Sequence, residues 1–499
     1  MNRQSFIRCH RILAWIGGIA LLVFGISGIS HPLMTWFGPP QAAFFPPQGN
    51  FSSTAVEAIP QVLASHGIER AQLVKVLPTA AGNLLQVSSD NGAVRRYFDL
   101  ESGAEHPDFD ARQAEWLARY YTGLADAPIR SIELLTAFDT AYPSVNRLLP
   151  VWQVSFAGND TPTTYVHTEL NALASITNGT RTLQQNLFQA LHTWSWLDGA
   201  EPLRVTVLVV LCGTLAAMAV TGLIMVFVLP GRTIRSAGRR WHRRTAWLLW
   251  LPLLTFSTSG LYHLLHNAGD AEPQTLVYGA DIPLAGLSGG ALLEPGAAPL
   301  NSITLLVGPA GEQLYRLAQP AGKPGQHVGH HGRFDGTPTE VPARLVNAAT
   351  GALSPFDDEQ LARAAAQRHL GIPAAAITGT ALVTRFDSDY DFRNKRLPVW
   401  RVNYTSPQHS GSAYIDPANG ALVDRITNAD HWEGLSFSQL HKWNFLTPFT
   451  GREIRDVLMV ATILALLTSA GLGIAMLIRR KPQLRARQAA AAQTLLRGS

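Results

Sequence analysis

Cysteine is almost absent from this chain, since only two occur in 499 residues, Cys9 and Cys212. One lies just before a long apolar run and the other lies within one, so a fold held together by disulfides outside a membrane is excluded. The motif CxxCH does not occur, which excludes covalently attached haem. No GxGxxG follows an expected strand, which excludes a dinucleotide-binding domain within the chain.

Charged residues are also scarce, at 15% of the chain against 46% hydrophobic residues. Four apolar runs reach the length of about 20 residues that a helix needs to cross a bilayer. They are Ile12 to Ile29, Val205 to Leu229, Thr245 to Leu265 and Val457 to Ile478. The first run lacks a small-x-small cleavage site after it, so we expect a retained anchor rather than a signal peptide. The sequence therefore predicts a membrane protein with a four-helix transmembrane bundle in a lipid bilayer.

Acidic residues are missing from three basic segments, which are the N-terminus, residues 230–244 and residues 480–499. The positive-inside rule places all three in the cytoplasm, with both termini. Residues 32–202 and 267–455 then form two large outer domains, which are periplasmic if the host has two membranes. The spans that connect these pieces are residues 1–31, 203–229, 245–266 and 456–479. The outer domains carry an acidic excess, so we expect no nucleic acid as a partner.

The second half of the chain repeats the first. HRILAWIGGIALLVFGISGISH, which begins at His10, aligns with HRRTAWLLWLPLLTFSTSGLYH, which begins at His242, at a distance of 232 residues. LHTWSWL aligns with LHKWNFL at a distance of 249 residues, and at this distance Gly222 falls on Gly471. The chain thus consists of two parallel span-domain-span repeats, and such repeats imply a pseudo-two-fold axis along the membrane normal.

The two outer segments have the patterns of α+β domains. VWQVSFAG and VWRVNYTS alternate apolar and polar residues, as half-buried antiparallel strands do. DARQAEWLARYYTG and DDEQLARAAAQRHLG have the period of amphipathic helices instead. YFDLESGA recurs loosely as YVHTELNALA, LVNAATGAL and YIDPANGAL, so each outer domain is expected to hold two small helix-plus-sheet units.

Histidine is abundant, with 16 in the chain, and the repeat sorts these residues. Six recur in matched pairs, which are His10 with His242, His31 with His263, and His192 with His441. The 21 residues between the first and last histidine of each repeated span correspond to about 31 Å of helix, which is the thickness of the hydrocarbon core. Each of these spans therefore offers one imidazole at the inner rim and one at the outer rim.

Two neutral imidazoles from different helices are the ligands of a six-coordinate b-type haem. Gly28 and Gly260 lie three residues before the outer histidines, where the lack of a side chain leaves room for a flat macrocycle. A metal ion alone fits less well, because no carboxylate or thiolate is expected near the spans. The sequence predicts His10 with His242 as the ligands of an inner haem.

The outer histidines allow two arrangements. A haem on the axis takes a symmetric pair, either His31 with His263 or His192 with His441. Two haems off the axis take mixed pairs, His31 with His441 and His263 with His192. We favour the mixed pairs, because both halves keep all four residues and an unpartnered buried imidazole is costly. Two or three haem b groups per chain are thus expected.

A further cluster, GQHVGHHGRFDG, contains His327, His330 and His331 in a glycine-rich outer loop without a counterpart in the first half. It either binds a metal or substrate or is a solvated loop, and the second interpretation is favoured.

Several of these motifs together resemble the PepSY-associated transmembrane family. HRILAWIGG and HRRTAWLLW open spans, SGISH and SGLYH close them, and LHTWSWLDG and LHKWNFL precede the return spans, which themselves contain TGL and AGLG. The outer domains contain elements of the form YxDxxxG, as PepSY units do. The resemblance covers nearly the whole chain and implies PepSY-like outer domains.

The family members that resemble this chain are haem-containing reductases of the bacterial inner membrane, which deliver electrons to ferric siderophores in the periplasm. The resemblance implies the same activity here. Because the chain has no dinucleotide fingerprint and no room for a flavin domain, quinol or a separate cytoplasmic reductase is expected as the electron donor. By position it assigns His10 and His242 to an inner haem. It assigns four residues to the outer haem or haems, His31, His263, His192 and His441. The alternative is a non-catalytic membrane protein whose PepSY units bind or restrain a periplasmic protease or envelope component.

The charge pattern makes a testable prediction about topology. Reporters fused after Leu229 or at the C-terminus should be active only in the cytoplasm, and reporters near Asp90 or Asp358 only outside it. Activity of a periplasmic reporter at the C-terminus would contradict the predicted orientation.

Overall fold

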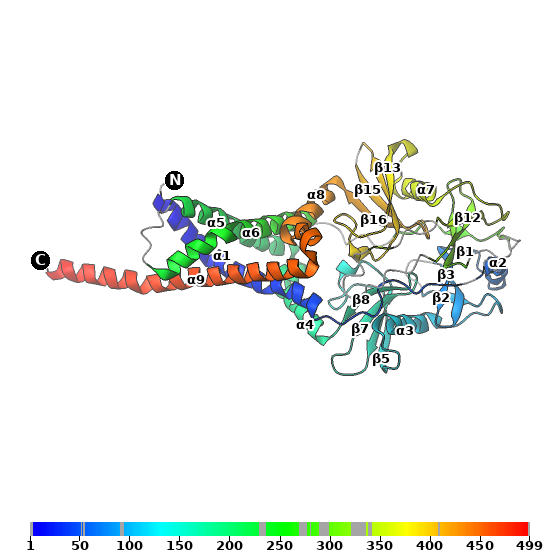
Figure 1. Ribbon diagram of the computed structural model, residues 1–499, viewed down its shortest axis with the longest axis horizontal. Helices are drawn as coiled ribbons and strands as arrows, with labels where there is room; N and C mark the ends of the chain where they lie inside the picture. Colours follow the sequence, from blue (N-terminus) through cyan, green and yellow to red (C-terminus); the bar gives the residue numbers. More distant parts are fainter. Residues whose placement is uncertain are drawn as a thin grey trace. The chain divides into compact units, whose positions relative to one another are not determined.

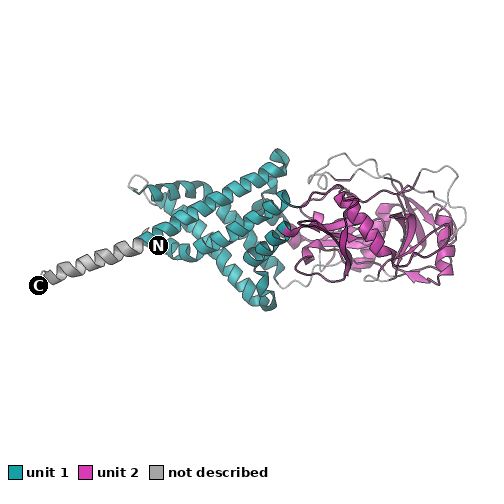
Figure 2. Ribbon diagram, turned by 90° about the horizontal axis from the view of Figure 1, so that it is seen from below, with its two compact units in different colours: residues 1–38, 180–270, 432–499 teal, residues 39–179, 271–431 magenta. Residues whose placement is uncertain are grey.

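A computed structural model of the chain describes residues 3–50, 52, 55–89, 94–228, 236–268, 277–279, 281–288, 299–320, 336–337, 342–407 and 410–497. The chain divides into two compact units, which Figure 2 shows in teal and magenta. The first, here called the helical unit, comprises residues 1–38, 180–270 and 432–499. The second, here called the sheet unit, comprises residues 39–179 and 271–431.

Four long helices form the helical unit (Figure 1). They are α1 (Arg3–Trp36), α5 (Glu201–Val228), α6 (Ala237–Asn267) and α9 (Thr447–Arg497). The described residues contain four helices that are long and apolar enough to cross a membrane, one over each predicted span, which confirms that prediction. Both α1 and α6 pack against α5 and α9.

Small residues bring these helices close together. A Cβ atom on Gly17 of α1 would lie 3.2 Å from the Met218 sulfur of α5, and one on Gly25 would lie 2.7 Å from Leu467 Cδ2 of α9. Close approach of this kind drives helix association in a membrane, where the hydrophobic effect between helices is lost. An apolar core in the middle of the bundle comprises Ala20, Leu21, Leu215, Ala219, Leu249, Leu253 and Leu466.

Short helices precede α5 and α9 and follow the same order in both halves. The first set is α4 (Gly179–Phe188), the π-helical turn η2 (Gln189–Thr193) and η3 (Ser195–Ala200). The second is α8 (Asn428–Ser436), the π-helical turn η8 (Phe437–His441) and η9 (Asn444–Leu446). Trp194 and Trp443 follow the π-helical turns with φ of 56° and 52°, so the chain turns sharply at both places.

The sheet unit contains two four-stranded antiparallel sheets of the same design. One is β5 (Ile129–Leu135), β6 (Val151–Phe156), β7 (Thr163–His167) and β8 (Ala172–Thr177), covered by α3 (Phe109–Thr122). The other is β13 (Ile377–Val383), β14 (Val399–Thr405), β15 (Ser410–Ile415) and β16 (Leu422–Thr427), covered by α7 (Asp358–Leu370). The strands predicted at β6 and β14 and the helices predicted at α3 and α7 are confirmed.

A six-stranded antiparallel sheet joins strands from both halves of the sequence. Its order is β12 (Arg344–Asn347), β11 (Gln313–Ala318), β10 (Ser302–Val307), β2 (Leu73–Thr79), β3 (Gly82–Ser88) and β4 (Arg96–Phe98). The halves meet where β2 pairs with β10, with Lys75 opposite Thr304. Helix α2 (Ala55–Ser65) packs its apolar residues against this sheet. The predicted outer segments 32–202 and 267–455 thus share one sheet.

Smaller elements complete the sheet unit. They are the strand pair β1 (Arg70–Ala71) and β9 (Ile282–Pro283), and the short helices η1 (Ser144–Asn146), η6 (Ala374–Ala376) and η7 (Phe392–Asn394).

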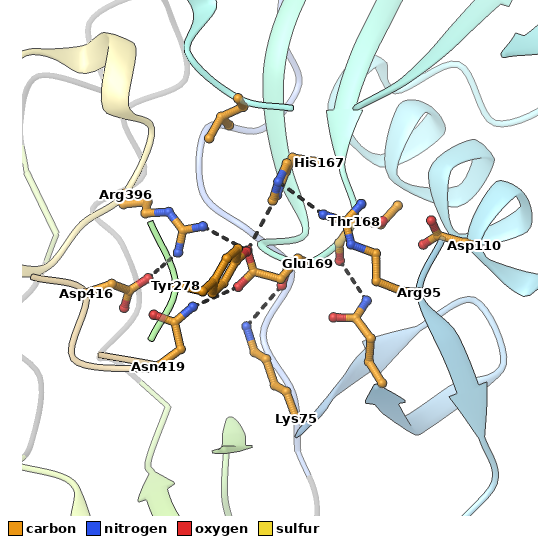
Figure 3. A network of polar contacts seen from close by, with 12 residues as sticks. Lys75, Arg95, Asp110, His167, Thr168, Glu169, Tyr278, Arg396, Asp416 and Asn419 are labelled. Carbon is orange, nitrogen blue, oxygen red and sulfur yellow. Dashed lines mark hydrogen bonds and ion pairs between the residues drawn. The ribbon is translucent and has the colours of Figure 1, made fainter. Parts of the chain in front are cut away.

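A buried polar network also joins the two halves inside the sheet unit (Figure 3). Glu169, in the turn between β7 and β8, is only 2% exposed. Its carboxylate accepts hydrogen bonds from Arg396 Nη2 at 2.8 Å and from the Tyr278 hydroxyl at 2.7 Å. Arg396 also pairs with Asp416, in the equivalent turn between β15 and β16. Burial opposes ionisation of Glu169, yet the nearby Arg396 and Lys75 hold the pKa of its carboxyl group far below the usual value.

Glu169→Gln should destabilise the protein by about 3–5 kcal/mol at pH 7, because it leaves the buried Arg396 charge without half of its compensation. The pKa of Glu169 is lower in the folded than in the unfolded state. The stabilisation that this carboxylate provides is therefore fully present above the unfolded-state pKa and is lost as the pH falls towards the folded-state pKa. The variant should accordingly lose less stability on acidification than the wild type. Denaturant unfolding of both proteins, at pH 7 and at an acidic pH below the unfolded-state pKa of glutamate, measures this difference.

Glu115→Gln is the matched control, because Glu115 pairs with Arg119 on a more exposed face of α3. It should cost less than about 1 kcal/mol. Equal destabilisation by the two variants would contradict the role given to Glu169.

Candidate functional site

Two histidines near the start of α1 and α6 each hydrogen-bond to the neighbouring helix. His10 Nδ1 lies 3.0 Å from Thr221 Oγ1 on α5. His242 Nδ1 lies 3.1 Å from the Ser469 carbonyl oxygen on α9. The two rings lie near each other. The predicted inner pair is therefore brought to one end of the bundle, here called the inner end.

A glycine on the same neighbouring helix lies against each of these rings. The Cε1 atom of His10 is 3.4 Å from where a Cβ atom on Gly222 would lie, and that of His242 is at the same distance from Gly473. The alignment of Gly222 with Gly471 does not give the equivalent contact, because no described atom outside the backbone of α9 lies within 4 Å of where a Cβ atom on Gly471 would lie. The second half has two additional residues between His441 and Gly473, which shifts the contact by half a turn along α9.

The histidines of the π-helical turns make the same kind of contact with α1 and α6. His192 Nδ1 lies 3.0 Å from Ser27 Oγ, and His441 Nδ1 lies 3.3 Å from Ser259 Oγ. The adjacent Gly28 lies 3.8 Å from His192 Cε1 and Gly260 lies 3.4 Å from His441 Cε1, again measured from an added Cβ atom. The space that these two glycines leave therefore receives the rings of His192 and His441.

These contacts assign the proton on each ring. The Thr221 hydroxyl donates to the Ala217 carbonyl at 2.8 Å and the Ser27 hydroxyl donates to the Val23 carbonyl at 2.8 Å, so both hydroxyl oxygens are left to accept from histidine. His242 and His441 face carbonyl oxygens, those of Ser469 and Phe256, which can only accept. All four rings thus carry hydrogen on Nδ1 and keep the Nε2 lone pair available. Among the described residues, no hydrogen bond uses these Nε2 atoms.

Phenylalanines stack on the two histidines of the π-helical turns. Phe188 stacks on His192 with ring centroids 4.7 Å apart, and Phe437 stacks on His441 at 4.8 Å. The two histidine rings themselves meet edge to face with centroids 6.3 Å apart. Of the outer pairs, the structure therefore brings His192 and His441 into direct ring contact.

Burial lowers the pKa of His192 to about 4. Burial, with a smaller contribution from His192, lowers that of His441 to about 3. Both rings are therefore neutral at physiological pH, which is the protonation state that coordinates iron.

The outer histidines of the spans have different surroundings in the two halves. His263 Nδ1 lies 2.6 Å from Glu433 Oε1, and its ring stacks on Phe437 with centroids 4.1 Å apart. The ring of His31 has an edge contact with Phe188, at 6.2 Å between centroids. In the part of the chain that the structure describes, no ring contact joins His31 with His441 or His263 with His192, so the choice between symmetric and mixed pairs stays a prediction.

The expectation that no carboxylate lies near the spans is wrong at Glu433. This residue precedes His441 by eight positions, and α8 with the π-helical turn folds it back onto α6. His327, His330 and His331 lie outside the described residues.

The hydroxyl groups that hold the histidines were not predicted from the sequence. A recognisable signal was present, because Ser27, Thr221 and Ser259 each directly precede a glycine. These dipeptides occur inside apolar helices, where a serine or threonine usually bonds to its own helix and a glycine marks close approach. In the fourth contact the two residues are separated, since Ser469 lies four positions before Gly473.

No protein-family model matches the chain, and no curated protein sequence matches it significantly.

Proposed function

We propose that the protein is a transmembrane b-type haem oxidoreductase of a bacterial inner membrane. It passes electrons from the cytoplasmic side to a ferric siderophore in the periplasm, which then releases Fe(II). The observation that carries the proposal is the set of four imidazoles with Nδ1–H fixed and Nε2 available. Fixing one ring nitrogen by a hydrogen bond is how proteins prepare the other for a metal.

The histidines form two layers, as electron transfer across a membrane requires. Along α1, His10 and Ser27, which holds His192, are 17 residues apart, and the same number separates His242 from Ser259 on α6. This corresponds to about 26 Å of helix. His10 with His242 would hold the inner haem. Residues of the outer layer, His31, His263, His192 and His441, would hold one or two outer haems.

The chain's own residues prepare these positions for a haem. The Thr221 and Ser27 hydroxyls and the Ser469 and Phe256 carbonyls orient the rings, so little side-chain entropy is lost when iron binds. The apolar core between the layers excludes water and charge from the middle of the bundle. When bound, haem supplies iron that exchanges one electron at a time between Fe(III) and Fe(II). Ligation by these histidines and the burial of the site would set its potential.

The resemblance to the PepSY-associated transmembrane family supports the same activity. On this proposal the sheet unit is periplasmic and PepSY-like, and the inner end of the bundle faces quinol or a cytoplasmic reductase. The acidic balance of the outer segments and the basic balance of the inner segments agree with this orientation. Reduction weakens a siderophore's hold because its hard oxygen donors favour Fe(III) over Fe(II).

His242→Ala should lose about one haem per chain, or convert it to high spin, because one axial ligand of the inner haem is removed. The outer haem should still be reduced by dithionite. After anaerobic addition of a ferric siderophore, the reduced outer haem should be reoxidised and Fe(II) should appear in a ferrozine trap. Visible spectra of the purified protein follow both events.

His266→Ala is the control, since His266 lies on the same helix but belongs to no matched pair. It should keep the full haem content. Unchanged haem content in His242→Ala would remove this residue from the ligands, and a failure of ferric siderophore to reoxidise the reduced protein would contradict the proposed acceptor.

A further inference from the structure

The outer ends of α1 and α6 differ in one contact, although their sequences are repeats. In the second half, the Glu433 carboxylate accepts a hydrogen bond from His263 Nδ1 at 2.6 Å. In the first half, the equivalent position is Gln184, 249 residues earlier. Among the described residues, no hydrogen bond reaches the ring nitrogens of His31. The two outer histidines of the spans therefore have unequal partners.

Glu433 is placed to act on this ring. Its side chain is 12% exposed, while that of His263 is 41% exposed, so the carboxylate is the more buried member of the pair. No other hydrogen bond or ion pair of this carboxylate occurs in the described part of the chain. The amide nitrogen of Asn267 donates to the His263 carbonyl oxygen at 2.7 Å and also lies 3.2 Å from His263 Nδ1. Because a carboxylate can only accept, the shorter contact places the hydrogen on Nδ1 and directs it to Glu433. The short distance is typical of a charge-assisted hydrogen bond.

Charges near the other histidine are mainly of the opposite sign. Lys442, Arg452 and Arg455 lie near His31, and one carboxylate, that of Asp456, pairs with the two arginines. A carboxylate at Nδ1 increases the donor strength of Nε2 and so stabilises Fe(III), whereas nearby positive charge stabilises Fe(II). The surroundings of His263 and of His31 would therefore favour different oxidation states of a bound iron.

We propose that Glu433 is a positioning residue that lowers the reduction potential of the outer haem bound by His263. This inference rests on the proposed function, because it requires that His263 is an iron ligand. With two outer haems, the one on the His263 side is then the harder to reduce, and the one on the His31 side accepts an electron first. With a single outer haem held by His31 and His263, Glu433 lowers the potential of that haem.

Potentiometric titration of the purified full-length protein, followed at the reduced α band, tests the proposal. Glu433→Gln keeps the size of the side chain and an acceptor oxygen but removes the charge. It should raise one outer midpoint potential by at least about 59 mV. At a fixed solution potential, this shift changes the oxidised-to-reduced ratio of a one-electron couple tenfold. The inner haem and the haem-to-protein ratio should not change.

Two further variants make the result specific. His263→Ala should abolish the midpoint that Glu433→Gln shifts. Glu201→Gln, which removes a carboxylate paired with Arg204 at the start of α5, should leave every midpoint unchanged.

The outcomes separate this inference from the proposed function. A wild-type protein without haem would overturn the proposed function, and the inference with it. A wild-type protein with haem, whose midpoints are all unchanged in Glu433→Gln, would overturn the inference alone. A shift in a midpoint that survives in His263→Ala, or the loss of one haem in Glu433→Gln in place of a shift, would overturn it as well.

Discussion

An imidazole at the edge of an apolar helix bundle must have its polar nitrogens satisfied, and the helical unit depends on how this is done. One nitrogen of each ring is used by the protein, through a hydroxyl or carbonyl group of the adjacent helix. The same contacts determine which helices can be neighbours, because His10 joins α1 to α5 and His242 joins α6 to α9. The second nitrogen keeps its lone pair, which the proposed haem iron would use.

The sequence alone predicts the elements that are specified by a hydrophobic periodicity or by the length of an apolar run. Four apolar runs became four long helices, and amphipathic stretches became α3 and α7. Internal repetition was equally informative, because it separated His192 and His441 from the histidines that occur once. Both residues lie in π-helical turns at equivalent positions. Such turns inside helices are often functional sites.

Contacts between distant segments could not be predicted in the same way. The hydrogen bond between His263 and Glu433 depends on a helix that folds back, and the pairing of Gly473 with His242 depends on a two-residue insertion. The shared six-stranded sheet arises where β2 meets β10, which no local pattern indicates. Glu169 shows the same limit, because its turn sequence gives no sign that Arg396, 227 residues away, is its partner.

The haem content of the purified full-length protein tests the central claim most directly. A folded preparation should show a Soret band and sharp reduced α and β bands, and pyridine extraction should give two or three b-type haems per chain. Three would favour mixed outer pairs and two would favour one axial outer haem. A colourless preparation that is fully folded would contradict the account, and would favour a non-catalytic protein that binds an envelope partner.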